Sequence, residues 1–134
     1  MCGLTGFWDA SGRGSRDELE STAARMAGML LHRGPDDGGT WADEAEGIAL
    51  GHRRLSIVDL SSCGHQPMES AGGRYVVAFN GEIYNFQPLR RELEQRGHRF
   101  RGHSDTEVLL AAVEAWGIEA ALRRFVGMFA FALW

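Results

Sequence analysis

Apolar residues recur at helical spacing in several stretches of the chain. Helices are expected over residues 15–31, 87–97 and 104–117, with a short one over 119–125. Ser15 with Glu18, and Ser104 with Glu107, have the three-residue spacing of a capping box, which marks a helix start. Pro88 suits the first position of the second helix, because that position needs no backbone N–H.

Other segments are rich in β-branched and aromatic residues and are bounded by turn residues, which is typical of strands. Strands are expected over residues 2–9, 40–42, 47–53, 55–60, 74–80 and 127–134. Those between residues 40 and 80 indicate an antiparallel meander. Pro35 disfavours a helical conformation at Gly34, so segment 32–39 is expected to be an ordered loop.

The final strand ends the chain without a turn or a polar tail. An apolar strand that stops in this way leaves apolar surface and a backbone edge to be covered. We interpret the chain as a fragment of a longer polypeptide, whose exposed edges would pair two copies into a homodimer.

Composition narrows the classes of protein that fit. At 134 residues the chain has the size of one domain. Its formal net charge is −4 and its basic residues are not clustered, so nucleic acid is not an expected partner. No apolar run reaches membrane-spanning length and no secretion signal opens the chain, so we expect no membrane partner and a cytoplasmic location.

Cys2 stands directly behind the initiator methionine. Removal of Met1 would place a thiol and a free α-amine on one residue, so the amine could take the thiol proton during nucleophilic catalysis. The alternative is that Cys2 is only a small buried apolar residue. Cys63 lies in a loop-like segment, and we interpret it as an incidental thiol that stays reduced.

Five histidines raise the question of a metal site. They are His32, His52, His65, His98 and His103. None has a paired spacing with cysteine or another histidine that is typical of zinc ligands. No metal is therefore expected.

Six short motifs occur in a fixed order along the chain. They are CGLTGF at 2–7, HRGPD at 32–36, RLSIVD at 54–59, GHQPM at 64–68, NGEIYN at 80–85 and SDTE at 104–107. In this order they resemble the class II glutamine amidotransferases, and most of all the glutaminase domain of glutamine-hydrolysing asparagine synthetases. The resemblance extends from the second residue to the last.

The resemblance implies the N-terminal-nucleophile hydrolase fold. This is an α+β, four-layer αββα sandwich with two mainly antiparallel sheets between helices, here expected to be incomplete at its C-terminal end. Residues 1–134 would then form a partial glutaminase domain, and the synthetase domain would be absent.

The resemblance also implies a reaction. The Cys2 thiolate attacks the side-chain amide of glutamine, ammonia leaves, and water hydrolyses the resulting thioester. The Asn80 side chain and the Gly81 N–H would stabilise the negative oxygen of the intermediate. From the residues alone, Asn80-Gly81 is more typical of a turn, and only the resemblance favours the role in stabilising the oxyanion.

A glutamine site must bind both an α-carboxylate and an α-ammonium group. The residues alone do not distinguish Arg53 from Arg54 as the carboxylate partner, whereas the resemblance selects Arg54. It also implies that backbone atoms of Leu55 and Ile57 complete this end of the site.

For the ammonium group, the resemblance indicates the carboxylates of Asp105 and Glu82. Each has a structural alternative: Asp105 lies in the first turn of a helix, where a carboxylate favours the helix dipole, and Glu82 would fit a solvated turn. The loop over 32–37 would shape the pocket or pack against it, and no chemical step is assigned to it.

By the same resemblance, this domain needs no cofactor, and its ammonia passes to a synthetase domain in cis. There the acceptor is aspartate, activated with ATP and magnesium. An amidotransferase with another acceptor is the first alternative. The second is a catalytically inert interaction module, because a retained Met1 would block the amine.

Overall fold

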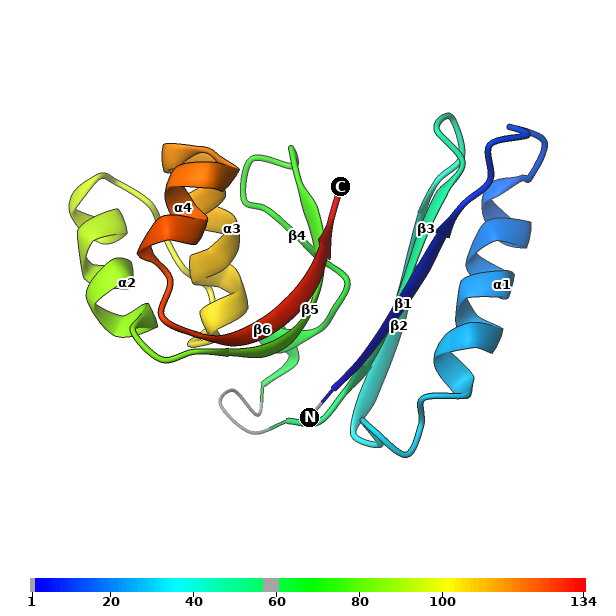
Figure 1. Cartoon of the computed structure of the whole chain (residues 1–134), viewed down its shortest axis with the longest axis horizontal. Coiled ribbons are helices and arrows are strands. Elements are labelled where there is room, and N and C mark those ends of the chain that lie inside the picture. Colours follow the sequence, from blue (N-terminus) through cyan, green and yellow to red (C-terminus); the bar gives the residue numbers. More distant parts are fainter. Residues whose placement is uncertain (1, 57–60) are drawn as a thin grey trace.

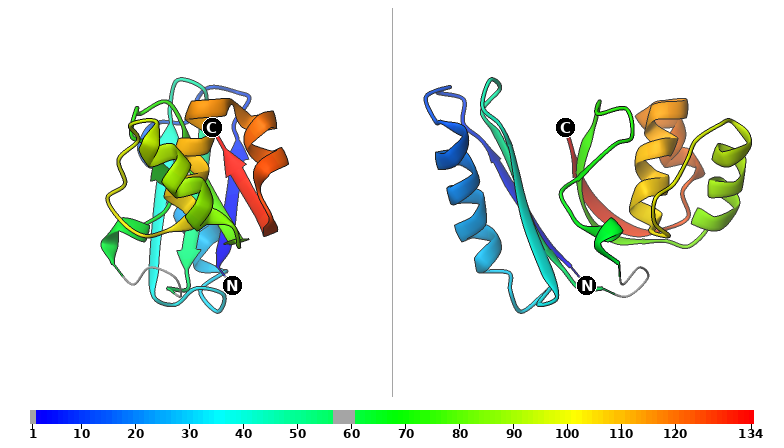
Figure 2. Two further views of the ribbon diagram at one scale, coloured as in Figure 1. Left: turned by 90° about the vertical axis from the view of Figure 1, so that its left-hand side faces the viewer. Right: turned by 180° about the vertical axis from the view of Figure 1, so that it is seen from behind.

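The computed structural model describes residues 2–56 and 61–134, which form two sheets with helices on their outer sides (Figure 1). The elements are β1 (Gly3–Trp8), α1 (Arg16–Gly28), β2 (Asp37–Asp43), β3 (Ile48–Arg54), a 3-10 turn (Ser62–Gly64), β4 (Met68–Glu69), β5 (Val76–Ile83), α2 (Phe86–Gln95), α3 (Asp105–Trp116), α4 (Ile118–Arg124) and β6 (Gly127–Leu133). Helix α1 covers the first sheet, and α2, α3 and α4 cover the second (Figure 2). The predicted αββα layering is confirmed.

The strands predicted as one meander are divided between the two sheets. One sheet has the order β1-β3-β2 and the other β4-β5-β6, and every pairing is antiparallel. The strand predicted over 55–60 is not seen at Leu55 and Ser56, and residues 57–60 lie outside the described part. The backbone N–H of Leu55 donates to Cys2 Sγ, and that of Ser56 donates to a carboxylate oxygen of Asp36, so side chains replace a partner strand.

The second sheet differs from the prediction in β5. This strand continues three residues past the predicted end at Asn80, and Asn80 and Gly81 pair with Ala130 and Phe129 of β6. A turn at Asn80-Gly81, which the residues alone favoured, is therefore not found. The two-residue strand β4, which pairs with the start of β5, was not predicted.

The helix starts follow the predictions only in part. Ser15 and Glu18 form both bonds of the capping box. Ser104 caps α3, but the Glu107 carboxylate accepts from the backbone N–H groups of Arg101 and Gly102 instead of completing a second box.

Two helix boundaries differ from the predicted ones. Helix α1 ends at Gly28, and turns continue to residue 33. Helix α2 begins at Phe86, so Pro88 is its third residue rather than its first. The third N–H of a helix also has no partner within the helix, which explains why proline is tolerated there.

Each sheet packs its outer face on helices in a separate apolar core. The larger core contains Val77, Phe79 and Ile83 of β5 with buried side chains of α2, α3 and α4. The smaller core lies between α1 and the first sheet, where Leu19 and Ala23 meet the alanines of β2 and β3. Both cores lie on the outer sides of the sheets, and the inner faces carry polar side chains such as His52 among small and apolar ones.

Side-chain hydrogen bonds join the inner faces of the two sheets. His52 of β3 is fully buried, and its Nε2 lies 2.9 Å from the Phe79 carbonyl oxygen of β5. A carbonyl oxygen can only accept, so Nε2 carries the proton. Indole N–H groups of Trp41 and Trp134 donate across the gap to Glu69 and Asp43, each at 3.1 Å.

Within residues 2–56 and 61–134, no helix is long and apolar enough to cross a bilayer.

Burial lowers the pKa of His52 to about 4. The unfolded chain, with a pKa near the ordinary 6.5, binds this proton more tightly than the folded chain. His52 therefore contributes stability above pH 6.5 that is lost as the pH falls from 6.5 to about 4. We expect this to remove up to about 3 kcal/mol from the free energy of unfolding.

Denaturant unfolding from pH 7 to pH 4 measures this loss. His52→Gln keeps a side-chain N–H donor but cannot be protonated, so its free energy of unfolding should fall less steeply across this interval. His32→Gln, in the exposed turn after α1, is the matched control. Equal slopes for wild type and His52→Gln would contradict the assignment.

Candidate functional site

A cavity of about 240 Å³ opens between the two sheets, where the chain begins, β3 ends and α3 starts. Its lining residues are Cys2, Arg54, Leu55, Gly64, Gln66, Phe79, Asn80, Gly81, Glu82, Tyr84, Ser104, Asp105, Thr106 and Met128. They include every predicted site residue except Ile57, which lies outside the described part. Segments far apart in the sequence thus contribute to one cavity.

The sulfur of Cys2 is held against the backbone of Leu55. Gly3 opens β1 opposite Arg53, which brings the preceding cysteine to the end of β3. The Leu55 N–H donates to Sγ at 3.4 Å, and the thiol donates to the Leu55 carbonyl oxygen at 3.7 Å. These contacts orient the half-buried thiol at the cavity wall.

Neighbouring arginines at the end of β3 point to opposite faces of the sheet, as alternation in a strand requires. Arg53 donates through Nε to the Gly34 carbonyl oxygen at 3.0 Å and does not line the cavity. Arg54 is buried and lines it. Of the two arginines, Arg54 is therefore the one that a ligand in the cavity could reach.

The Arg54 guanidinium is held by the segment that leads to β4. Its Nη1 donates to the Ser61 carbonyl oxygen at 2.8 Å. Its flat face lies so close to Gly64 that a Cβ at this position would overlap the guanidinium. Position 64 therefore requires glycine, because the Arg54 guanidinium packs directly against its backbone.

The backbone of β5 directs one N–H group into the cavity. The backbone N–H and C=O of Val76 both bond to Trp134. In this antiparallel pair, the backbone N–H and C=O groups of the even-numbered residues of β5 therefore point toward β6, and those of the odd-numbered residues point away from it. The N–H of Phe79 donates to the Gln66 side chain at 2.6 Å, and that of Ile83 donates to the Asp105 side chain at 2.9 Å. Gly81 lies between them, and no side chain in the described residues accepts from its N–H.

The side chains of the same strand complete this part of the site. A Cβ on Gly81 would overlap backbone atoms of Met128 and Phe129, so glycine is needed for the pairing with β6. The Asn80 carboxamide makes no hydrogen bond with any residue that the structure describes. Its Oδ1 is buried, which leaves the amide nitrogen as the donor that can meet a ligand.

Asp105 is a buried carboxylate at the first position of α3. Its Oδ2 accepts from the Ile83 N–H, which ties the start of the helix to β5. Burial raises its pKa above the ordinary value, and the nearby Glu82 charge acts in the same direction. A cation in the cavity would offset the cost of the buried charge.

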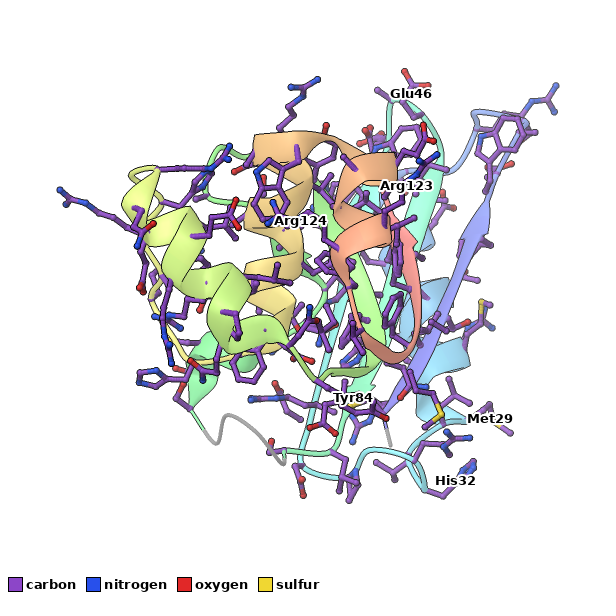
Figure 3. The ribbon with its side chains drawn as sticks, turned by 60° about the vertical axis from the view of Figure 1, so that its left-hand side comes forward. Met29, His32, Glu46, Tyr84, Arg123 and Arg124 are labelled. Atoms are coloured by element: carbon purple, nitrogen blue, oxygen red, sulfur yellow. The ribbon has the colours of Figure 1, made fainter. Side chains whose placement is uncertain are left out.

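Glu82 is exposed at the rim of the cavity, in strand β5 rather than in the solvated turn that was its alternative. Tyr84, labelled in Figure 3, is also exposed and lies at the mouth.

The HRGPD loop packs beside the site without entering it. None of its described residues lines the cavity. The Asp36 N–H donates to the Arg54 carbonyl oxygen, and the Asp36 carboxylate accepts from Ser56, so this loop braces the end of β3. Asp37 pairs with His65 at 2.8 Å.

Several cavity residues were not predicted as site residues. They are Gly64, Gln66, Phe79, Tyr84, Ser104, Thr106 and Met128. Gly64 and Gln66 belong to the GHQPM motif, to which the sequence analysis gave no role. Cys63 lies outside the cavity as an exposed free thiol, and the described residues contain no cluster that could hold a metal ion.

Comparison with known proteins gives a family and a set of relatives. The family model of the glutamine amidotransferase domain matches residues 1–134, the whole chain. Asparagine synthetase [glutamine-hydrolyzing] 1 of Bacillus subtilis is 43% identical over 134 residues, which are 100% of this chain and 21% of that protein. A putative asparagine synthetase [glutamine-hydrolyzing] of Mycobacterium bovis is 45% identical over 145 residues, covering 100% of this chain and 22% of that protein.

A solved structure shares the fold. Glutamine phosphoribosylpyrophosphate amidotransferase from B. subtilis, complexed with ADP and GMP, has a TM-score of 0.79 and 22% identity. The match covers 98% of this chain and 34% of that one. The predicted N-terminal-nucleophile hydrolase fold is confirmed.

Substitutions at Asp105 separate its charge from its hydrogen bond. Because burial raises the pKa, ionised Asp105 lowers stability as the pH rises through that pKa. Asp105→Asn removes the charge but keeps an oxygen for the Ile83 N–H, so its free energy of unfolding at pH 7 should equal or exceed that of wild type. At pH 3 the two should converge.

Asp105→Ala is the control, because it leaves the Ile83 N–H without its acceptor. It should cost about 1–3 kcal/mol in denaturant unfolding. An Asn variant as unstable as the Ala variant at pH 7 would contradict the burial argument.

Proposed function

Because this chain belongs to the family of glutamine amidotransferase domains, we propose that its cavity binds free glutamine and that Cys2 hydrolyses the side-chain amide to glutamate and ammonia. One observation carries the proposal. A thiol, an N–H that no described side chain accepts from, a buried guanidinium and a buried carboxylate all belong to residues that line a single cavity.

The reaction needs no histidine. With Met1 removed, the α-amine of Cys2 takes the thiol proton, and the thiolate attacks the amide carbon. The amine returns the proton to the nitrogen, the carbon–nitrogen bond breaks and ammonia leaves. Water then attacks the thioester, and its proton passes through the amine to the departing sulfur.

Negative charge develops on the amide oxygen during each attack. The Gly81 N–H and the Asn80 amide nitrogen are the donors for this oxygen. The pairing of β5 with β6 fixes the Gly81 N–H and the backbone of Asn80 before substrate arrives, which reduces the reorganisation needed in the transition state. That they line the cavity together with Cys2 supports this role.

Charged groups select the free amino acid. Arg54 binds the α-carboxylate, with backbone atoms of Leu55 and Ile57 beside it. Asp105 binds the α-ammonium group deep in the cavity, and Glu82 adds a second carboxylate at the rim. The cost of burying the Asp105 charge is offset when the ammonium group binds, which makes the site selective for a zwitterion.

The chain spans about a fifth of the length of the curated relatives described above. For a full-length protein of this kind we propose that ammonia reaches aspartate, activated with ATP and magnesium by a synthetase domain in cis, to give asparagine. Since the chemistry needs a reduced thiol, we place it in the cytoplasm.

Cys2→Ala should abolish glutamine hydrolysis and labelling by a glutamine-like electrophile, because Cys2 carries the only thiol among the described residues that line the cavity. Ammonia release and intact-protein mass spectrometry measure the two effects. Cys63→Ala, which removes the exposed thiol, is the matched control and should retain both.

The mass of the wild-type chain is part of the same experiment. Loss of one methionine with turnover supports the mechanism. Full turnover by Cys2→Ala would refute it, and retained Met1 without turnover would favour the inert module.

Arg54→Lys should raise KM for glutamine by about tenfold to a hundredfold, because a lysine cannot form the paired bonds of a guanidinium with a carboxylate. Arg53→Lys is the matched control on the opposite face of β3 and should leave KM near wild type. Steady-state kinetics with glutamine tests both variants. The assignment is wrong if the Arg53 variant shows the larger change.

A further inference from the structure

Gln66 is a buried side chain whose polar atoms are both bound within the protein. It lies between the 3-10 turn and β4, and only 5% of it is exposed. Its Oε1 accepts from the Phe79 N–H at 2.6 Å, and its Nε2 donates to Thr106 Oγ1 at 3.4 Å. The backbone N–H can only donate, so it fixes which end of the carboxamide faces β5.

The two partners of Gln66 are each adjacent to a residue of the proposed site. Phe79 immediately precedes Asn80, and Thr106 immediately follows Asp105. One side chain therefore links the strand that carries the proposed oxyanion donors to the helix that carries the proposed ammonium ligand.

A second link lies on the other side of Gly81. Asp105 accepts from the Ile83 N–H, so β5 is tied to the start of α3 both before and after Gly81. The Phe79 carbonyl oxygen is held in turn by His52. The backbone N–H and the backbone carbonyl of Phe79, which both point away from β6, are thus bonded to buried side chains.

We propose that Gln66 is a positioning residue for the hydrolysis of glutamine. It holds the Phe79 backbone and thereby sets the direction of the Asn80 carboxamide and the Gly81 N–H relative to Asp105. Its Oε1 and Nε2 bond to Phe79 and Thr106, so we assign it a role through these two residues rather than a direct contact with the reacting atoms. The proposal rests on the proposed function.

Loss of this link should slow the chemical step more than it weakens binding. The oxyanion exists only at and near the transition state, whereas the contacts to the α-carboxylate and α-ammonium groups exist throughout. A displacement of reacting groups by about 1 Å is enough to cost about a hundredfold in rate. A reduced kcat with a little-changed KM is therefore the expected signature.

Gln66→Met tests this, because methionine has a similar length and no hydrogen-bonding carboxamide. We expect kcat to fall by about tenfold to a hundredfold while KM for glutamine stays within about threefold. Labelling of Cys2 by iodoacetamide, a small reagent that needs no oxyanion donors, should proceed at the wild-type rate when it is followed on the Cys2 peptide, because the exposed Cys63 also reacts. Circular dichroism checks that the variant is folded. Gln95→Met, on the exposed face of α2, is the matched control.

Thr106→Val is a second test of the proposal. It removes the hydrogen bond between Gln66 and Thr106, leaves the one between Gln66 and Phe79, and keeps the shape of the side chain. It should show the same kcat-selective loss at smaller size. The double variant should lose no more than Gln66→Met alone, because both substitutions break one connection.

Wild-type kcat in Gln66→Met, or a raised KM with unchanged kcat, would overturn the proposal. If Gln66→Met does not fold, wild-type kinetics in Thr106→Val would overturn it. If the wild-type chain itself neither hydrolyses glutamine nor reacts with a glutamine-like electrophile, the proposed function fails instead.

Discussion

The site depends on how β5 satisfies its backbone hydrogen bonds on the side away from β6. Buried N–H groups need partners, and β4 is only two residues long, so it cannot supply them along the whole strand. Side chains do so instead: Gln66 accepts from Phe79, and Asp105 accepts from Ile83. The N–H of Gly81 is left between two anchored peptides, and it faces a cavity rather than a strand. A shortened partner strand thus leaves a fixed donor in the cavity that Cys2 also lines.

The cavity also contains two buried charged side chains, Arg54 and Asp105. Hydrogen bonds with the backbone of Ser61 and of Ile83, respectively, help to orient them. A buried carboxylate with a raised pKa weakens the fold, whereas a bound ammonium group would compensate its charge. In the proposed function, the buried charge of Asp105 lowers the stability of the free protein, and the ammonium group of a bound zwitterion compensates that charge.

Local signals in the sequence were sufficient for most of the helices and strands, whereas the candidate site residues came from the resemblance of the motifs to a known family. Ser15 and Ser104 mark their helices because capping uses contacts within four residues. The division of the meander between two sheets and the short strand β4 were missed, because they depend on pairing between distant segments. Asn80-Gly81 favours a turn locally, yet β6 pairs with it as strand. Gln66 could not be identified, since its role depends on Phe79 and Thr106, which the fold alone brings to it.

The most direct test is a crystal structure of the chain without Met1, after Cys2 has reacted with a glutamine analogue whose side chain ends in an electrophilic ketone. The account predicts the ketone oxygen at about 2.7–3.1 Å from both the Gly81 N–H nitrogen and the Asn80 amide nitrogen. The carboxylate of the analogue should lie on Arg54 and its ammonium group on Asp105. An oxygen that faces solvent, with the Gly81 N–H bonded elsewhere, would contradict the account.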